Sequence, residues 1–129
     1  MSFLSNLQID GKEYKVLESS YLLNQPIDRV GKPKGRPEGG KITVTIKSEG
    51  KTDLFQWMKE SSLAKSGSLT FYKDNAMAIL FELKFSNAFC INYTEHFLST
   101  TTKPMTTTIT ISAQEIDLGG VKFDNLWEL

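Results

Sequence analysis

The chain has 129 residues, 40% of them hydrophobic and 11% aromatic, which is enough apolar material for one folded domain, residues 1–129. Fifteen Lys and Arg balance fifteen Asp and Glu, so the net charge gives no reason to expect nucleic acid or an anionic membrane as a partner. The single cysteine excludes an internal disulfide. Residues 1–7 lack the basic and apolar segments of a secretory signal, and no run of apolar residues is long enough to span a membrane, so we expect a cytoplasmic protein.

The first part of the chain predicts two strands. Residues 3–9 form the first, which ends at the Asp10-Gly11 turn, a good hairpin signal. Residues 13–25 form a longer second strand with apolar residues on both faces. Apolar residues on both faces are expected when a strand is covered on two sides, once by its own core and once by something else.

A long loop follows at residues 28–40. It contains two prolines, four glycines and four cations, and it has no periodic pattern. A loop of this length without its own secondary structure is usually functional or disordered. The residues leave two alternatives open, a mobile solvated segment or a segment that docks against a partner.

The next stretch changes from strand to helix. Ile42, Val44 and Ile46 alternate with polar residues over positions 41–48, which predicts a half-buried strand. Residues 53–60 then predict a short helix that covers one opening or face of a β protein, with Thr52 or Asp53 as its cap. Four apolar residues at spacing i, i+1, i+3, i+4 are predicted to form its buried face: Leu54, Phe55, Trp57 and Met58.

The second half reads as further strands. Residues 67–73 form one, a turn follows at Asp74-Asn75, and residues 105–113 form another that can extend to 118. Residues 76–85 form a strand or begin as helix, Ser86-Asn87 marks a break or bulge, and residues 89–94 resume the alternation. Residues 121–129 form a short strand or a tail. The odd positions of residues 76–85 are predicted to face inward: Met77, Ile79, Phe81, Leu83 and Phe85.

The predicted fold class follows from this pattern. Seven to nine short strands with one helix indicate a mainly β protein, a small antiparallel β-barrel (two packed sheets) with one short α-helix and a long loop. The strands do not alternate with helices, so a parallel sheet is not expected.

No catalytic, cofactor or metal site is predicted. Cys90 and His96 are the only thiol and imidazole, and on one straight strand they stand about 20 Å apart, too far for a nucleophile and its base. We expect a packed thiol and a surface or interface imidazole. A zinc site needs about four Cys, His or acidic ligands at motif spacing, and one Cys with one His does not supply such a set. Phosphate-loop, paired-carboxylate and base-stacking patterns are also missing, so the sequence favours a protein that acts through its surfaces.

Several motifs in order along the chain resemble a known family, the tube-forming Hcp (TssD) proteins of type VI secretion systems, in the branch typical of Bacteroidetes. The resemblance covers essentially the whole chain, and the combination is more specific than any single motif. One departure is the strongly apolar run at residues 78–81. The matching motifs are residues 10–17 (DGKEYKVL), 24–25 (NQ), 35–40 (GRPEGG), 53–58 (DLFQWM), 66–67 (SG), 71–72 (FY), 83–85 (LKF) and 109–112 (ITIS).

The resemblance implies a β-barrel that assembles as a homohexameric ring with an open lumen. Stacked rings would form a tube inside a contractile sheath, which drives tube, spike and effector proteins into a neighbouring cell, and the protein would be exported without a signal peptide. Neither nucleic acid, membrane insertion nor a cofactor is implied. The loop at residues 28–40 would reach the adjacent ring, with five candidate contacts: Arg29, Lys32, Lys34, Arg36 and Glu38.

The residues themselves are compatible with such an assembly. A net charge of zero avoids repulsion among many identical copies, and a loop rich in glycine and proline is expected to become ordered only on docking. The main alternative is a barrel that binds a small ligand or carbohydrate, which predicts a monomer or dimer with an enclosed apolar cavity. A hydrolase that depends on Cys90 or His96 is the third hypothesis.

Overall fold

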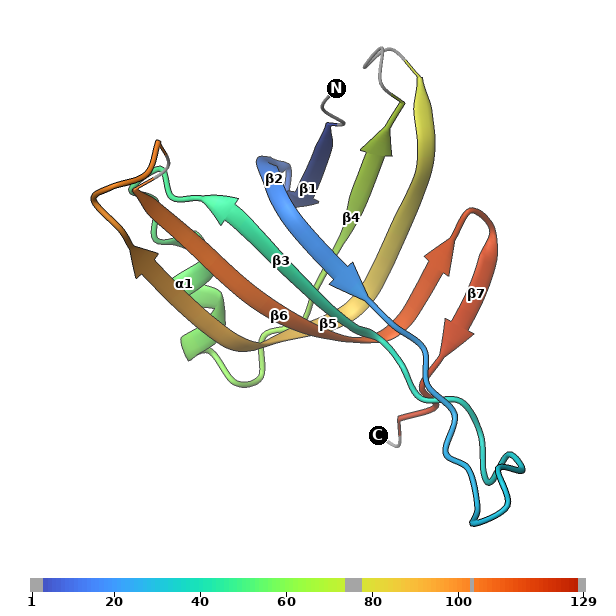
Figure 1. Cartoon of the computed structure of the whole chain (residues 1–129). Coiled ribbons are helices and arrows are strands. Elements are labelled where there is room, and N and C mark those ends of the chain that lie inside the picture. Colours follow the sequence, from blue (N-terminus) through green and yellow to red (C-terminus); the bar gives the residue numbers. More distant parts are fainter. Residues whose placement is uncertain (1–3, 74–77, 103, 128–129) are drawn as a thin grey trace.

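The computed structural model describes residues 4–73, 78–102 and 104–127, and Figure 1 shows their arrangement. The described part contains seven strands and one short helix. Their bounds in chain order are β1 (Ser5–Ile9), β2 (Lys12–Tyr21), β3 (Lys41–Lys47), α1 (Asp53–Lys59), β4 (Lys65–Tyr72), β5 (Ile79–Phe97), β6 (Met105–Leu118) and β7 (Val121–Asp124).

The strands form one antiparallel sheet that closes on itself. Their order is β3-β2-β1-β4-β5-β6-β7, and an additional pairing of β3 with β6 joins the first strand to the sixth. Six strands therefore make a closed barrel, and β7 extends the sheet beyond it along the last residues of β6 (Figure 1). The predicted fold class, a small antiparallel barrel with one helix, is confirmed, with the two predicted layers belonging to one continuous sheet.

Of the two alternatives predicted at Ser86-Asn87, a break or a bulge, the structure shows the bulge. The strand runs unbroken from Ile79 to Phe97. Asn87 adopts a positive φ of 50°, and the register with β4 shifts between the pairs Lys65–Ala88 and Gly67–Phe85. A bulge absorbs an extra residue and bends a strand without ending it, so β5 turns around the barrel in one piece. The predicted turn at Asp74-Asn75 and the inward position of Met77 lie outside the described residues.

The core follows the alternation of the strands. Ile42, Val44 and Ile46 of β3 are at most 5% exposed. The first two pair with the buried Ile111 and Ile109 of β6. Their polar neighbours point outward, where hydroxyl groups pair between the same two strands. The barrel is therefore filled by branched aliphatic side chains, as the period of two requires.

Two corrections concern the start of β5. Leu83 and Phe85 are buried as predicted, but Ile79 and Phe81 are 54% and 38% exposed. Phe81 lies at the rim of the barrel and packs on Phe71, with ring centroids 5.0 Å apart. Phe81 keeps the predicted alternation, but a register shift between the pairs Phe71–Phe81 and Tyr72–Ile79 interrupts it before Ile79. At Phe81 the inward face has reached the rim of the barrel, where no further layer of described residues covers it.

The helix α1 packs across the opposite end of the barrel. Trp57 is 1% exposed and donates its indole N–H to the carbonyl of Leu63 at 2.9 Å. Leu54 is also buried and Met58 is half-buried, whereas Phe55 is 56% exposed. Phe55 was predicted to belong to the buried face. It lies instead at the margin of the helix, edge-on to Tyr93 with ring centroids 5.4 Å apart.

Candidate assembly surfaces

The residues considered for catalysis do not form a site. Cys90 is buried on β5, and its thiol lies 3.5 Å from the carbonyl of Asn92. Burial raises the pKa of this thiol, which keeps it protonated and unreactive. His96 lies exposed further along the same strand. Among the described residues, no three His, Cys, Asp or Glu side chains come together as a metal site would require.

Residues 24–38 form an arm that projects from one end of the barrel, away from α1 (Figure 1). The arm is a two-stranded ribbon and not an irregular loop. Asn24 and Glu38 exchange backbone hydrogen bonds, with N–O distances of 2.8 and 2.5 Å, and Ile27 pairs with Pro33. The amide of Lys34 also donates to the carbonyl of Pro26 at 2.7 Å. The expectation that this segment becomes ordered only on docking is therefore wrong, because its own backbone pairs hold it.

The tip of the arm is a compact turn. The Asp28 carboxylate accepts the backbone N–H groups of Val30 and Lys32, each at 3.0 Å, and Gly31 supplies a positive φ of 86°. A short acidic side chain that binds the backbone two residues ahead is a common way to stabilise such a turn. Val30 is 84% exposed at the apex, so the tip presents an apolar side chain between Arg29 and Lys32.

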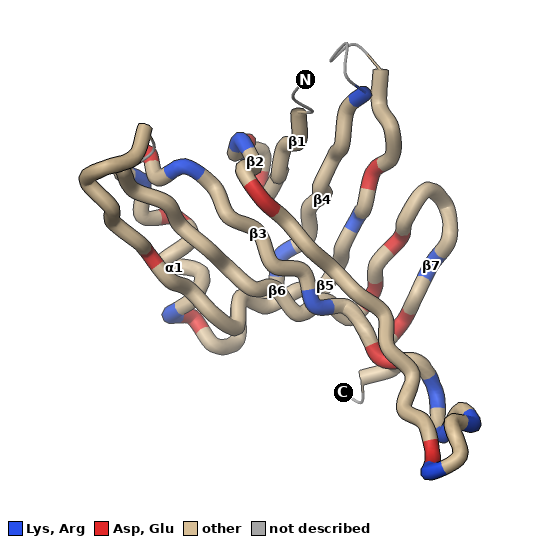
Figure 2. Tube along the Cα trace, in the orientation of Figure 1, with Lys and Arg blue, Asp and Glu red and all other residues tan. Residues whose placement is uncertain are grey.

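The five predicted contact residues fall into two groups. Arg29, Lys32 and Lys34 are exposed. Figure 2 shows Lys and Arg positions along the arm. Arg36 is instead bound to its own chain, since its guanidinium donates to the carbonyl of Asp124 at 2.8 Å and lies 5.6 Å from the centre of the Phe123 ring. Glu38 is exposed, and its backbone forms the first pair of the ribbon. Sequence reasoning missed that Arg36 fastens the arm, because the two partners are 88 positions apart.

Charge is distributed unevenly between arm and barrel. Residues 24–38 carry four cations and two carboxylates, an excess of two positive charges. Because the whole chain is neutral, the remainder carries an excess of two negative charges. The arm therefore carries a net charge opposite in sign to that of the rest of the chain.

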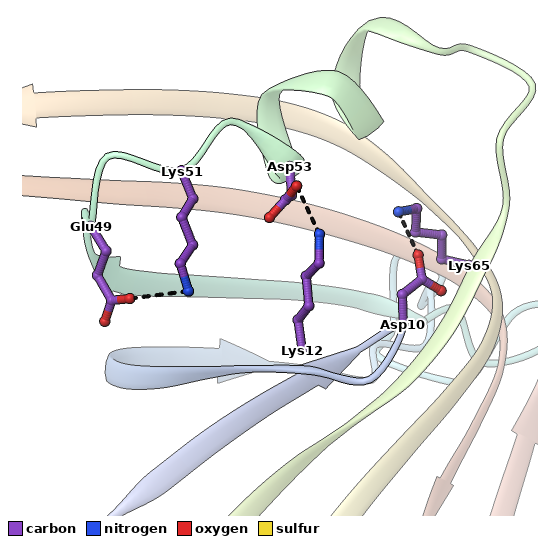
Figure 3. Close-up of polar contacts among 6 residues, drawn as sticks. All are labelled: Asp10, Lys12, Glu49, Lys51, Asp53 and Lys65. Carbon is purple, nitrogen blue, oxygen red and sulfur yellow. Dashed lines mark ion pairs between the residues drawn. The ribbon is translucent and has the colours of Figure 1, made fainter.

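Two ion pairs lie at the end of the barrel that α1 covers, one of them with the helix itself (Figure 3). Lys12 of β2 lies 2.8 Å from Asp53 at the start of the helix, and Lys65 of β4 lies 2.6 Å from Asp10. The hydrogen bond between Lys12 and Asp53 raises the pKa of the lysine and lowers the pKa of the aspartate. Thr52, one of the two predicted caps, makes no side-chain capping bond. The pair of Lys12 with Asp53 is solvated, so it orients the helix more than it stabilises it.

A groove of about 340 Å³ lies at the end of the barrel from which the arm projects. It is lined by side chains of β2, β5, β6 and β7, and by Leu23 at the start of the arm. Leu23 and Val121 at its margin are 54% and 75% exposed. Apolar side chains thus remain exposed at the end of the barrel that α1 does not cover.

Two strand edges lack a strand partner in the described part of the chain. Pairing of β2 with β1 stops at Lys15, so residues 17–21 of β2 pair with β3 alone. Pairing of β5 with β4 stops at Ala88, so residues 89–97 of β5 pair with β6 alone. The layer β2-β3-β6-β5 therefore ends in two different open edges, each of which can accept a strand from another chain.

An ordered arm, two open strand edges and an exposed apolar groove define a protein of the class that acts through contacts with other subunits. The family model described as hemolysin coregulated protein Hcp (TssD) matches residues 1–128, and the chain belongs to this family. It is a tube protein of the type VI secretion class, a structural family that is not known for enzymatic activity.

Solved structures agree with this assignment. Hcp1 from Flavobacterium johnsoniae is 43% identical, with a TM-score of 0.90 over 95% of this chain and 99% of that chain. Hcp1 from Salmonella typhimurium is 13% identical, with a TM-score of 0.75 over 95% of this chain and 92% of that chain. A chain of the sheath-tube complex of an extracellular contractile injection system, PVC, is 23% identical, with a TM-score of 0.58 over 91% and 88%.

The last two likenesses concern the fold alone. No curated protein sequence matches the chain. No helix in the described ranges is long and apolar enough to cross a membrane.

Proposed function

We propose that this chain forms homohexameric rings that stack into the inner tube of a type VI secretion machine. The observation that carries the proposal is the ordered, positively charged arm on a barrel with the opposite excess of charge. The tube would carry or propel effector proteins and contact the sheath and the spike. The protein would be made in the cytoplasm and exported through the machine without a signal peptide. The alternative of a ligand-binding barrel is not favoured.

The open strand edges support a ring. Residues 17–21 of β2 and residues 89–97 of β5 lie on opposite borders of one four-stranded layer. If the β2 edge of one copy pairs with the β5 edge of the next, each contact uses two different patches. Such heterologous contacts close into a ring when the rotation between neighbours divides a full turn. Closure removes every open edge of this layer and so protects it from aggregation.

The arm supports stacking. It leaves the barrel at the end opposite α1, so in a stack of identically oriented copies it points toward the α1 end of the next ring (Figure 1). Its tip carries one exposed apolar side chain, Val30, beside the cations Arg29 and Lys32. A ribbon that is already ordered loses little conformational entropy when it docks, which favours association.

The test separates ring from stack. Size-exclusion chromatography with light scattering is expected to give a mass near six subunits, and electron microscopy is expected to show stacked rings. Replacing residues 27–34 by an Asn-Gly dipeptide should leave the rings intact and remove the stacks. Lys32→Glu should weaken stacking, whereas Lys84→Glu, on the exposed face of β5, makes the same change of charge away from both the arm and α1 and serves as its matched control.

Two results would contradict the proposal. A chain that stays monomeric at high concentration cannot be a ring subunit. Stacks that persist without residues 27–34 would exclude the arm from the contact between rings.

A further inference from the structure

The base of the arm is fastened by the segment that follows β7. The side-chain amide of Asn125 donates one hydrogen bond to the carbonyl of Gly39 at 2.9 Å and another to the carbonyl of Ala113 at 2.8 Å. Its backbone N–H donates to the carbonyl of Gln114, also at 2.8 Å. A single residue therefore connects the base of the arm with β6 and with the end of β7.

The position of Asn125 coincides with a change of partner along β6. The strand β3 pairs with β6 as far as Ser112, and β7 takes over the same edge at Glu115. The carbonyls of Ala113 and Gln114 lie between these two pairings, and Asn125 satisfies both. A buried carbonyl without a partner is costly, so this junction needs a donor. Asparagine suits it because its amide has two N–H groups.

The backbone at the junction leaves little freedom for the arm. Gly40 has a positive φ of 89°, and its carbonyl accepts the amide of Ala113 at 2.8 Å. A Cβ atom on Gly40 would lie 2.4 Å from the carbonyl oxygen of Ala113 and 2.5 Å from the Asn125 amide nitrogen. Arg36 adds the bond to Asp124 on the other side of the ribbon. We call Arg36, Gly39, Gly40, Asp124 and Asn125 the clasp.

We propose that Asn125 is a positioning residue, which sets the direction in which the arm leaves the barrel and thereby allows one ring to engage the next. The inference rests on the proposed function of the arm, and Asn125 itself need not touch the neighbouring ring. A small rotation at the base of the arm produces a larger displacement at its far end. The ribbon extends about 13 Å from Asn24 to the start of the turn at Asp28, at ~3.3 Å per residue. A rotation of about 10° at its base would therefore move the turn by about 2 Å, enough to break a hydrogen bond of ~3 Å.

The test uses Asn125→Asp, which keeps the shape of the side chain but replaces the donor nitrogen with an oxygen that faces two carbonyls. Gln8→Glu, on the exposed face of β1, makes the same change from amide to carboxylate outside the arm, the clasp and α1. Ring mass is measured by light scattering, stacking by counting stacked rings in electron micrographs, and opening of the clasp by hydrogen exchange of the Ala113 amide.

Asn125→Asp is expected to form rings of unchanged mass, while the fraction of stacked rings falls at least tenfold. Exchange of the Ala113 amide should become at least tenfold faster, because the hydrogen bond to Gly40 then opens locally. The Gln8→Glu control should change neither quantity. If Asn125→Asp fails to fold, Asn125→Ala removes the donors without adding a charge and takes its place.

Stacking at the wild-type level in rings of the Asn125 variant would overturn the inference. So would loss of the ring, or of the folded subunit in both variants, because Asn125 would then support the whole subunit and not the arm alone. Failure of the proposed function looks different. In that case the wild-type chain forms no rings, or its stacks survive removal of residues 27–34.

Discussion

The two ends of the barrel are built in opposite ways. At one end, α1 inserts Leu54 and Trp57 into the core, and an ion pair ties the start of the helix to β2 (Figure 3). At the other end, no helix of the described residues covers the core, an apolar groove stays open, and the chain extends into the arm. The first end gains its stability within the subunit. The second leaves apolar surface and backbone exposed, as expected of a surface completed by another copy.

Truncating the aromatic residue that fills the closed end should have the largest effect on stability. Trp57→Ala is expected to lower the free energy of unfolding by about 3–5 kcal/mol, because it leaves a cavity in the core. Phe55→Ala, two positions away and 56% exposed, should cost about 1 kcal/mol or less. Urea unfolding of both variants measures the difference. Equal losses would mean that the two faces of the helix are equally buried.

A somewhat smaller effect is expected at the base of the arm. Gly40→Ala combines a left-handed backbone with a collision between Cβ and the Ala113 carbonyl, and should cost about 2–3 kcal/mol. Gly35→Ala is its control, because Gly35 has a similar φ of 82° but no atom within 4 Å of the added Cβ. In Gly35→Ala the free energy of unfolding should fall only by the cost of a left-handed backbone at a residue with a side chain, about 1 kcal/mol. If Gly40→Ala is no worse than Gly35→Ala, the junction has room to relax.

High pH should destabilise the subunit mainly through tyrosines at the closed end. Burial and the hydrogen bond to Glu95 raise the pKa of Tyr93 to about 12, and burial also raises the pKa of Tyr14. Between pH ~10, where an unfolded tyrosine loses its proton, and pH ~12, the folded state holds more protons than the unfolded state. The free energy of unfolding therefore falls as pH rises through this window. Absorbance of tyrosinate checks the titration, and Tyr93→Phe should flatten the decline.

The smallest effect concerns the ion pair between Lys12 and Asp53. Because the pKa of Asp53 is lowered in the folded state, its contribution is present above its unfolded pKa and is lost as pH falls. Both side chains are solvated, so salt should remove the contribution. Thermal unfolding of Asp53→Asn at low and high ionic strength tests this. A difference from wild type that persists at high salt would point to a role beyond charge.

The closed end was largely predictable from the sequence. The period of two over residues 41–48 fixed the inward face of β3, and the change of period at Leu54 located the helix. Phe55 was misassigned because four apolar residues fit one helical face by spacing, although a helix at the rim of a barrel buries a narrower stripe. Phe81 was misassigned for a related reason, since alternation reports the face of a strand and not where the barrel ends.

The arm and the clasp were harder to predict from the sequence. Glycine and proline in residues 28–40 indicated a loop, but the pairs that make it a ribbon are single backbone bridges with no side-chain pattern. Asn125 could not be identified, because it contacts Gly39 across 86 positions and no local motif marks it. The family resemblance pointed to the function of the arm, whereas the residues that hold it emerged from the structure.

The order already present in the arm has a thermodynamic consequence. When a segment folds as it binds, the association shows a large negative change in heat capacity and a large entropic penalty. Here the backbone hydrogen bonds of the arm form within one subunit, so the addition of a ring to the tube should resemble rigid docking. Calorimetry of tube growth at several temperatures should accordingly give a modest heat-capacity change, set by the apolar area around Val30 and not by the length of the arm.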